Sequence, residues 1–221
     1  MKLSHLFSLA AGALALTFLS GCAGTRLSPD PNPVAYKPHN PANVRIKVSL
    51  DKQQVYVMEG QRPLLVAATC VGLPNKPTPC GNFTVFRKIA DKRSGSYGYW
   101  VKGNEIRAGK SGERPGSGYH YVGYPMQNWV EFLPAYGFHQ GYVWPVARTH
   151  GCLRLHKNVA PKFFALARIG TPVNIAHHQP EDDTIGKNVP RPHDYNDPDP
   201  DPHYMISSQV FSKPAGPLLQ E

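Results

Sequence analysis

Alternating hydrophobic and polar residues predict a series of β-strands in the first half of the chain. Residues 44–50 and 54–58 both follow the two-residue period of a half-buried strand. A short turn leads into a third apolar run over residues 64–71, and residues 83–86 form a fourth run after a proline-rich turn. Three strands in such close succession predict an antiparallel meander.

The second half of the chain carries less regular patterns. Residues 88–118 are mostly polar with scattered glycines, which predicts a long loop or a weak hairpin. Residues 119–138 are rich in aromatic side chains, and we expect them to form core and cleft wall. Residues 158–168 predict a helix with Asn158 as its N-cap. With a closing strand over residues 171–175, the predicted fold class is mainly β, a β-rich α+β domain.

Proline-rich flanks divide the chain of 221 residues into one domain and two extended ends. Residues 22–43 are polar and contain five prolines, as is typical of a flexible tether. The Asp-Pro repeats within residues 177–221 can neither bury apolar surface nor form a regular ladder, which predicts an extended or disordered tail. A single domain over residues 44–176 remains between the two flanks.

Residues 1–21 have the features of a bacterial export signal. An apolar run over residues 6–19 follows Lys2 and is too short to span a bilayer comfortably as a helix. The run Leu19-Ser-Gly-Cys22 resembles the bacterial lipobox, which implies cleavage before Cys22 and its acylation as a membrane anchor. Because Ala23 follows rather than Asp, the resemblance implies a periplasm-facing lipoprotein of the outer membrane. An ordinary secretory signal with an incidental cysteine is the alternative.

The net charge is distributed unevenly along the chain. Residues 22–176 carry 20 Lys and Arg against 7 Asp and Glu, a net charge of +13, whereas residues 177–221 carry 3 against 8, a net charge of −5. A basic domain suits a polyanionic or carboxylate-rich partner, and the export signal disfavours nucleic acid. We expect cell-wall polymer, acidic lipid or the protein's own tail as the partner; a generically basic envelope protein is the alternative.

The opposite net charges of the domain and the tail would draw the tail over the cleft, unless the tail is simply solvated.

Two of the four cysteines are candidates for a disulfide. Cys70 and Cys80 flank a turn-forming segment in a chain with an export signal, and disulfides persist outside the cytosol. A bridge between them would close a short loop and contribute about 2–3 kcal/mol. Two buried free thiols are the alternative.

The remaining cysteine lies in the segment with the most informative chemistry. Cys152 follows His150 and Gly151 directly, and His139 precedes it by thirteen residues. A cysteine nucleophile needs a base or cation to supply its thiolate, and backbone N–H groups to hold the developing oxyanion. Two histidines and one glycine near a cysteine meet both needs, although the same residue types also ligate zinc.

The motif Thr149-His-Gly-Cys-Leu-Arg154, preceded by His139, resembles the signature of the L,D-transpeptidase (YkuD-type) catalytic domain. Three flanking segments agree with that family: residues 50–57 resemble its opening hairpin, residues 78–83 its Thr-Pro-x-Gly-x-Phe turn, and residues 126–132 its cleft segment. The resemblance covers roughly residues 44–176. It implies a twisted β-sheet or small sandwich with one helix after the cysteine.

The resemblance also implies a role for each residue of the motif. Cys152 would attack the carbonyl of a diamino acid in a peptidoglycan stem peptide and release D-alanine, and an amine of a second stem would resolve the thioester into a 3→3 cross-link. His139 would act as the base and His150 would orient or polarise, although either histidine remains a candidate for the dominant base. Backbone N–H groups near Gly151 would hold the oxyanion. The last sites are Thr149, which would orient the motif, and Arg154, which would bind a carboxylate or, as we favour, brace the loop.

The resemblance further implies acylation of Cys152 by carbapenems and no need for a metal or an organic cofactor. The chain departs from the family in carrying Gln140 after the histidine and a short lid over residues 140–148, which would admit water. The alternatives are therefore an L,D-endopeptidase or carboxypeptidase, an enzyme that attaches or detaches a lipoprotein, and a vestigial wall-binding protein. A zinc hydrolase is a further, less favoured alternative.

Overall fold

The structure, a computed structural model, describes residues 30–221. The predicted signal peptide over residues 1–21 and the predicted lipidation site at Cys22 lie outside the described residues. Within the described part of the chain, no helix is long and apolar enough to cross a membrane.

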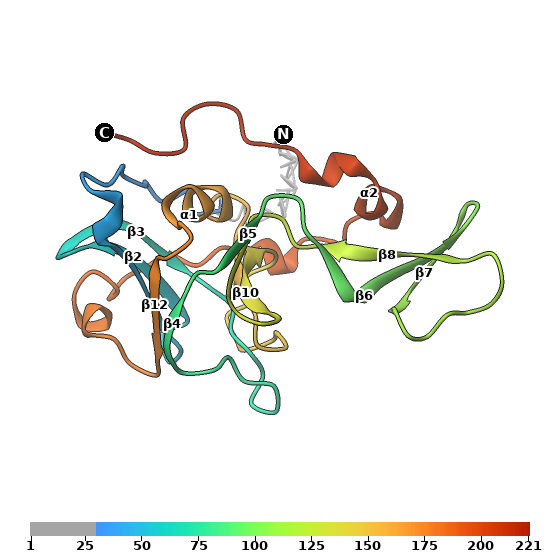
Figure 1. The fold of residues 1–221 in the computed structure, drawn as a ribbon, viewed down its shortest axis with the longest axis horizontal. Helices are drawn as coiled ribbons and strands as arrows, with labels where there is room; N and C mark the ends of the chain where they lie inside the picture. The colour runs from blue at the N-terminus through green and yellow to red at the C-terminus, as the bar shows by residue number, and fades with distance from the viewer. Residues whose placement is uncertain (1–29) are drawn as a thin grey trace, which may run out of the picture.

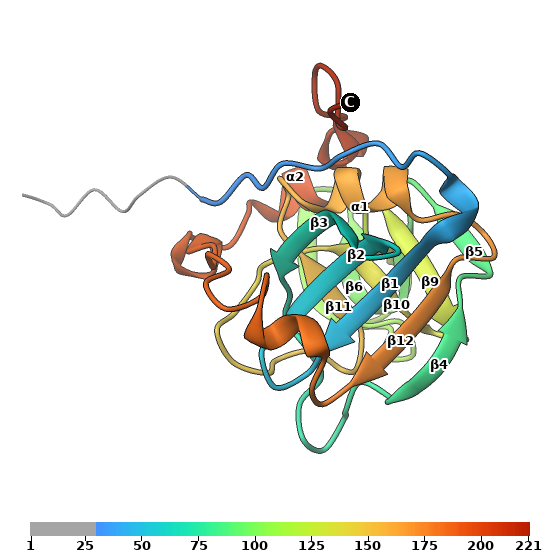
Figure 2. The ribbon, with the colours of Figure 1, turned by 90° about the vertical axis from the view of Figure 1, so that its left-hand side faces the viewer.

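A five-stranded sheet forms one layer of the domain, in the strand order β3-β2-β1-β12-β4 (Figure 2). The first three strands pair antiparallel, so the predicted meander is confirmed. The closing strand β12 then inserts parallel to β1, and β4 adds to its other side. The bounds are β1 Val44–Ser49, β2 Gln54–Glu59, β3 Arg62–Ala68, β4 Gly81–Thr84 and β12 Pro172–Ala176.

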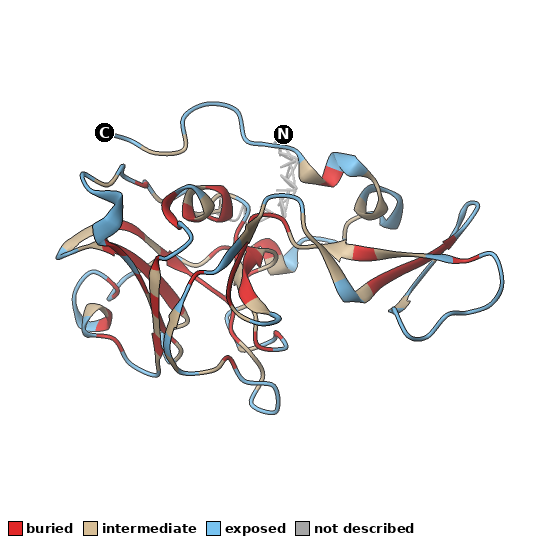
Figure 3. Cartoon of the chain, in the orientation of Figure 1, coloured by how far each residue is buried: buried red, intermediate tan, exposed pale blue. Residues whose placement is uncertain are grey.

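A four-stranded sheet with the order β11-β10-β9-β5 forms the second layer. Apolar side chains from the two sheets and from the helix α1 make one continuous core, and Figure 3 shows the buried residues gathered there. Phe138 packs on Phe163 of the helix with ring centroids 4.5 Å apart. The mainly β class is thereby confirmed. The bounds are β5 Arg87–Ile89, β9 Trp129–Leu133, β10 Tyr136–Gln140, β11 Leu153–Leu155 and α1 Ala160–Leu166.

The helix α1 is shorter than the predicted span of residues 158–168 and begins differently. Its N-cap is Val159, which makes no side-chain cap, and Pro161 lies in its first turn. Asn158 was the predicted cap, but its amide donates instead to the Pro31 carbonyl oxygen at 3.3 Å. A contact with the N-terminal segment therefore takes the place of the local cap.

Residues 88–118, predicted as a long loop or a weak hairpin, contain a hairpin, to which a third strand from the following aromatic-rich stretch adds to make a three-stranded sheet. Its strands are β6 (Arg93–Lys102), β7 (Glu105–Lys110) and β8 (His120–Pro125), and they project from the body as an arm (Figure 1). Cross-strand aromatic pairs hold the arm, with Tyr99 against Tyr124 and Trp100 against Tyr121. Two of the glycines that obscured this pattern are required by close packing: a Cβ on Gly98 would lie 2.3 Å from the Val122 carbonyl oxygen, and one on Gly123 would lie 1.9 Å from the Ser94 carbonyl oxygen.

The C-terminal segment after β12 wraps around the domain and contains short helical elements, where we predicted an extended or disordered tail. Arg93 anchors it by donating to the carbonyl oxygens of Met205, Ile206 and Ser207. Gln220 then pairs with residues 35–37 of the N-terminal segment. Single anchor residues thus order a segment that buries little apolar surface. Its elements are the 3-10 helices Pro180–Asp183, Asp194–Asn196 and Ser208–Phe211 and the helix α2 Pro202–Ile206.

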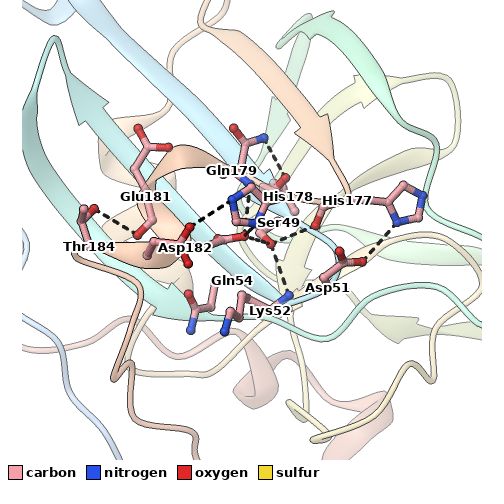
Figure 4. A network of polar contacts seen from close by, with 12 residues as sticks. Ser49, Asp51, Lys52, Gln54, His177, His178, Gln179, Glu181, Asp182 and Thr184 are labelled. Carbon is pink, nitrogen blue, oxygen red and sulfur yellow. Dashed lines mark hydrogen bonds and ion pairs between the residues drawn. The ribbon is translucent and has the colours of Figure 1, made fainter.

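Asp182 joins the start of this segment to the five-stranded sheet (Figure 4). Its buried carboxylate accepts hydrogen bonds from Tyr56 at 2.7 Å, Ser49 at 2.8 Å and the Gln179 N–H at 3.1 Å, and it lies 3.0 Å from His178 Nδ1. Burial by itself raises the pKa of Asp182, but the hydrogen bonds outweigh it and the pKa is lowered. The Asp182 cluster therefore holds an ionised carboxylate as a cross-link.

The predicted disulfide between Cys70 and Cys80 is not formed, because both residues are free thiols. Cys70 is buried with its Sγ 3.5 Å from the Val146 carbonyl oxygen, and its backbone pairs with Arg154. Cys80 is exposed at the start of β4. The turn between them keeps one thiol facing the interior and the other facing solvent, whereas a bridge requires the two Cβ vectors to face each other.

Candidate active site

The parallel register of β10 and β11 places three of the predicted site residues on one face. Phe138 pairs with Leu153 and His139 pairs with Arg154. Side chains alternate along a strand, so His139 and Arg154 point away from the core in which Phe138 and Leu153 are buried. Cys152 precedes β11 by one residue and, by the same alternation, shares the face of Arg154. We call this outward side of the four-stranded sheet the catalytic face.

Two rows of residues cross the catalytic face. Arg87, Glu131 and Gly137 pair in that order across β5, β9 and β10. Cys152, one residue before β11, extends this row, because the next residues of the two strands, Phe138 and Leu153, are paired. The second row holds Ile89 and Trp129, then His139 and Arg154. The rings of Trp129 and His139 lie 6.0 Å apart between centroids. A polar row containing the thiol therefore runs beside a row containing the histidine.

His139 is held as a neutral base. Its side chain is buried, and Nδ1 lies 2.7 Å from the Gln140 carbonyl oxygen, which accepts the Nδ1 proton and leaves the Nε2 lone pair free. Burial, together with the positive charge of Arg154, lowers the pKa of His139 to about 4. At neutral pH the imidazole is therefore uncharged and able to accept a proton.

His150 occupies a different environment at the mouth of the site. It is exposed in the loop before Cys152, and its Nε2 lies 3.4 Å from Lys76 Nζ. Tyr97 of the arm contacts its ring edge-on, with centroids 5.1 Å apart. Partial burial lowers the pKa of His150, and the charges of Lys76 and Arg154 add to the effect. The arm thus contributes one wall beside the second predicted histidine.

The Cys152 thiol is half-buried and in contact with backbone groups of β10 and its preceding turn. Its Sγ lies 3.7 Å from the Ala135 carbonyl oxygen and also receives a backbone hydrogen bond from Gly137. Burial raises the pKa of the thiol, although the Gly137 bond and the charges of Arg154 and Lys92 oppose this. Cys152 is therefore protonated at neutral pH and needs a base to become a thiolate.

Thr149 and Gly151 fix the loop that presents Cys152. The Thr149 hydroxyl donates to the Cys152 carbonyl oxygen at 2.6 Å and accepts from the Gly151 N–H at 3.1 Å. Gly151 has a φ of +105°, and a Cβ there would lie 2.4 Å from a ring carbon of Tyr136, so only glycine fits. Because the Gly151 N–H is engaged within the loop, the Cys152 N–H becomes the nearest free candidate for an oxyanion donor; within residues 30–221 it has no hydrogen-bond partner.

The sequence favours a role for Arg154 in bracing the loop, but its side chain does not brace it. Its backbone N–H and carbonyl pair with Cys70, but its guanidinium has no hydrogen-bond or ion-pair partner among the described residues. Gly141 packs on the aliphatic stem, where a Cβ would lie 3.0 Å from Arg154 Cδ. The backbone therefore provides the bracing, and the positive charge stays available beside His139 and Cys152.

The C-terminal segment packs against the short lid over residues 140–148. Tyr142 donates to the Pro198 carbonyl oxygen at 3.1 Å, and the Val143 N–H donates to Asp194 at 3.1 Å. The ring of Tyr195 lies 5.3 Å from that of Trp144. The acidic segment thus reaches the edge of the site, and the negative charge of Asp199 helps to raise the pKa of Tyr99 in the arm.

Sequence reasoning missed three groups that shape the site: Lys92, Tyr97 and Glu131. Glu131 was detectable, because in the stretch of residues 129–132 it alternates with two core residues and so belongs to the face of His139. Lys92 and Tyr97 come from the arm and the loop before it, where no strand pattern was recognised. In the part of the chain that is described, no group of three His, Cys, Asp or Glu side chains is placed to hold a metal ion.

Fold and site together define a two-layer β domain with a cysteine and a histidine on one sheet face. The family model of the L,D-transpeptidase catalytic domain (YkuD) matches residues 43–175, more than half of the chain. The chain therefore belongs to the L,D-transpeptidase catalytic domain family. Among curated protein sequences, none gives a significant match.

Several solved structures are similar to the chain. An L,D-transpeptidase from Mycobacterium smegmatis is 16% identical, with a TM-score of 0.46, over 61% of this chain and 58% of its own. One from Stackebrandtia nassauensis is 16% identical, with a TM-score of 0.44, over 66% and 60%. The catalytic domain of the E. faecium L,D-transpeptidase is 22% identical, with a TM-score of 0.44, over 63% and 100%. The chain spans 58% and 60% of the length of the first two of these structures.

Proposed function

We propose that the protein is a peptidoglycan L,D-transpeptidase with Cys152 as nucleophile and His139 as base. Family membership supports the reaction class. The observation that carries the assignment of roles is the shared sheet face, on which a neutral buried histidine, a protonated thiol and an unpaired guanidinium lie side by side. His150 is exposed beside Lys76, which makes it the weaker base candidate.

The first half of the reaction forms a thioester. Nε2 of His139 accepts the proton of the Cys152 thiol, and the thiolate attacks the carbonyl carbon of a diamino acid in the donor stem. The Cys152 N–H donates to the oxyanion of the tetrahedral intermediate. As the amide C–N bond breaks, His139 returns the proton to the leaving nitrogen, and D-alanine departs as a free amine.

The second half resolves the thioester. The side-chain amine of an acceptor stem attacks the thioester carbonyl, His139 takes the amine proton, and the C–S bond breaks to regenerate the thiol. A new amide bond joins the two stems as a 3→3 cross-link. Arg154 binds a carboxylate of the stem peptide, because its guanidinium is positioned beside the thiol and needs an anionic partner.

The same proposal places the enzyme at the envelope. The lipobox-like run ending at Cys22 gives it a lipid anchor in the outer membrane, and the basic domain suits a carboxylate-rich polymer. Carbapenems would acylate Cys152 because their strained carbonyl meets the same thiolate.

Intact-mass measurement with meropenem tests the proposal. Residues 23–221 should gain one adduct mass, and the matched variant Cys152→Ala should gain none. A folded protein that shows no adduct, while Cys152 remains open to alkylation, would refute the assignment.

A second experiment uses tetrapeptide muropeptides as substrates to separate transfer from hydrolysis. New cross-linked dimers indicate transfer, whereas shortened or cleaved stems without dimers indicate hydrolysis and would contradict the transferase.

A further inference from the structure

Glu131 is a buried carboxylate in the same row as the nucleophile. Its side chain is 7% exposed, and Gly137 is the only residue between it and Cys152 across the strands. Gly137 has no side chain, and the Trp129 ring lies over it, since a Cβ on Gly137 would lie 2.9 Å from Trp129 Cη2 and Cζ2. The carboxylate and the thiol are therefore separated by two strand spacings, about 10 Å between backbones, with the edge of the Trp129 ring over the position between them.

The carboxylate also holds the turn that touches the thiol. Glu131 Oε1 accepts from the Ala135 N–H at 3.1 Å, and Oε2 accepts from Trp129 Nε1 at 3.1 Å. Ala135 has a φ of 66°, a conformation that costs free energy for a residue with a Cβ and therefore needs support. The carbonyl oxygen of this same residue lies 3.7 Å from Cys152 Sγ.

We propose that Glu131 is a positioning residue for the proposed cysteine chemistry. It fixes the strained Ala135 turn so that the Ala135 carbonyl holds the Cys152 thiol in one orientation, and its negative charge opposes formation of the thiolate. This inference rests on the proposed function for the identity of the nucleophile. Arg87 lies 3.2 Å from Glu131 Oε2 with its side chain 57% exposed, and it partly offsets that charge.

The electrostatic part of the inference has a definite sign. Burial is the largest effect that raises the pKa of Cys152, and the charge of Glu131 adds to it. Removing the negative charge should therefore increase the thiolate fraction, whereas removing the offsetting charge of Arg87 should decrease it. The charged and titratable groups around the thiol come from every neighbouring element: Arg154 on β11, Glu131 on β9, His139 on β10, His150 in the preceding loop and Lys92 before the arm.

Alkylation by iodoacetamide, followed peptide by peptide in the full-length protein, tests the charge effect. At pH 7 we expect Glu131→Gln to raise the rate at Cys152 about two- to fivefold and Arg87→Gln to lower it. The exposed Cys80 in the same sample is the internal standard for the alkylation rate of an accessible thiol. The buried Cys70 reports unfolding, because it reacts only when the domain opens. Shifts in the same direction for both variants, or no shift in either, would overturn the inference. If Glu131→Gln unfolds, Arg87→Gln still decides the sign.

Meropenem acylation tests the positioning effect. Glu131→Ala removes the acceptor of the Ala135 N–H, so we expect acylation of Cys152 to fall about tenfold or more while iodoacetamide alkylation does not fall. A small reagent needs only a thiolate, whereas acylation needs a fixed thiol. A parallel loss in both reactions would indicate a structural role only. Absence of any adduct in the unsubstituted protein would refute the proposed function, and the alkylation results would still decide the role of Glu131.

Discussion

The Asp182 cluster and the catalytic face are both polar, but they differ in their hydrogen-bond partners: the chain itself supplies partners for the Asp182 carboxylate and leaves groups on the catalytic face without them. Both oxygens of the Asp182 carboxylate accept hydrogen bonds from the chain itself, and the cluster ties the C-terminal segment to the five-stranded sheet. On the catalytic face, the His139 Nε2, the Arg154 guanidinium and the Cys152 N–H have no hydrogen-bond partner among the described residues. Neither His139 Nε2 nor the Arg154 guanidinium is among the buried side-chain atoms that lack a partner, so both are open to solvent and accessible to a substrate.

The same difference in hydrogen-bond partners explains the two pKa shifts. Hydrogen bonds from the chain lower the pKa of Asp182 in spite of its burial, so it is ionised and contributes to stability. His139 has one backbone acceptor and a positive neighbour, and burial lowers its pKa to about 4, so it is neutral and contributes reactivity. We expect substitutions in one cluster to change the free energy of unfolding and substitutions in the other to change rates.

The largest effect should follow from His139→Gln. Removing the base should reduce the rate of meropenem acylation at Cys152 by about 10²- to 10⁴-fold, the usual contribution of a positioned general base. Stopped-flow measurement or timed intact mass gives the rate, and His150→Gln is the matched control with a smaller expected loss. If His150→Gln loses more activity than His139→Gln, the base has been assigned to the wrong histidine.

The pH profile sharpens this prediction. A histidine with a pKa of about 4 remains neutral as the pH falls, so the acylation rate should stay nearly constant between pH 7 and pH 5.5 and decline as the pH approaches 4. A base with an ordinary pKa of about 6.5 would lose roughly tenfold over that interval. A steep decline between pH 7 and 5.5 would contradict the buried neutral base.

Asp182→Ala should produce the largest loss of stability. Leaving Tyr56, Ser49 and the Gln179 N–H without their acceptor should cost about 3 kcal/mol and lower Tm by about 5–10 °C. Because the pKa of Asp182 is lowered, its contribution is present above an unfolded-state pKa of about 3.9 and is lost as the pH falls below it, so the difference from the unsubstituted protein should shrink in acid. His177→Ala, which removes an exposed pair with Asp51, is the control and should leave Tm unchanged. If folded Asp182→Ala were acylated at Cys152 more slowly than the unsubstituted protein, the Asp182 cluster would affect the rate as well as the stability, which would contradict the expected separation of the two roles.

Arg154→Gln should have a smaller effect, confined to binding. Loss of a charge-assisted hydrogen bond to a carboxylate should lower kcat/KM for a stem peptide about 10- to 100-fold, mainly through KM. Arg62→Gln removes a surface arginine paired with Glu59 and serves as the control. An equal loss with a donor whose carboxylates are amidated would contradict carboxylate binding by Arg154.

Local pattern was sufficient to predict the meander, and the motif was sufficient to single out the nucleophile. The alternation of residues 44–50 and 54–58 specified the meander, and the close spacing of Thr149 to Arg154 identified the motif because its residues interact within one loop. The arm was predicted only as a loop or weak hairpin because its glycines interrupt the alternation, although its three strands follow one another in the sequence. The C-terminal segment was missed because single side chains such as Arg93 anchor it, and composition does not reveal anchors. The prediction of a disulfide between Cys70 and Cys80 was wrong because spacing in the sequence does not show which way the two side chains point, and a disulfide requires both to point toward each other.

The smallest effect concerns the contact between the C-terminal segment and the lid, where the two regions meet. We expected opposite charges to draw the tail over the cleft, and residues 194–198 do pack against the lid. Deleting the whole segment would also remove Asp182 from the fold, so Tyr195→Ala is the cleaner test. Loss of its ring contact with Trp144 should loosen the lid and raise alkylation of Cys152 up to about twofold, with a further rise at high salt as the acidic segment is screened. Reactivity that is unchanged by the substitution and across a range of salt would show that this segment does not control access to the thiol.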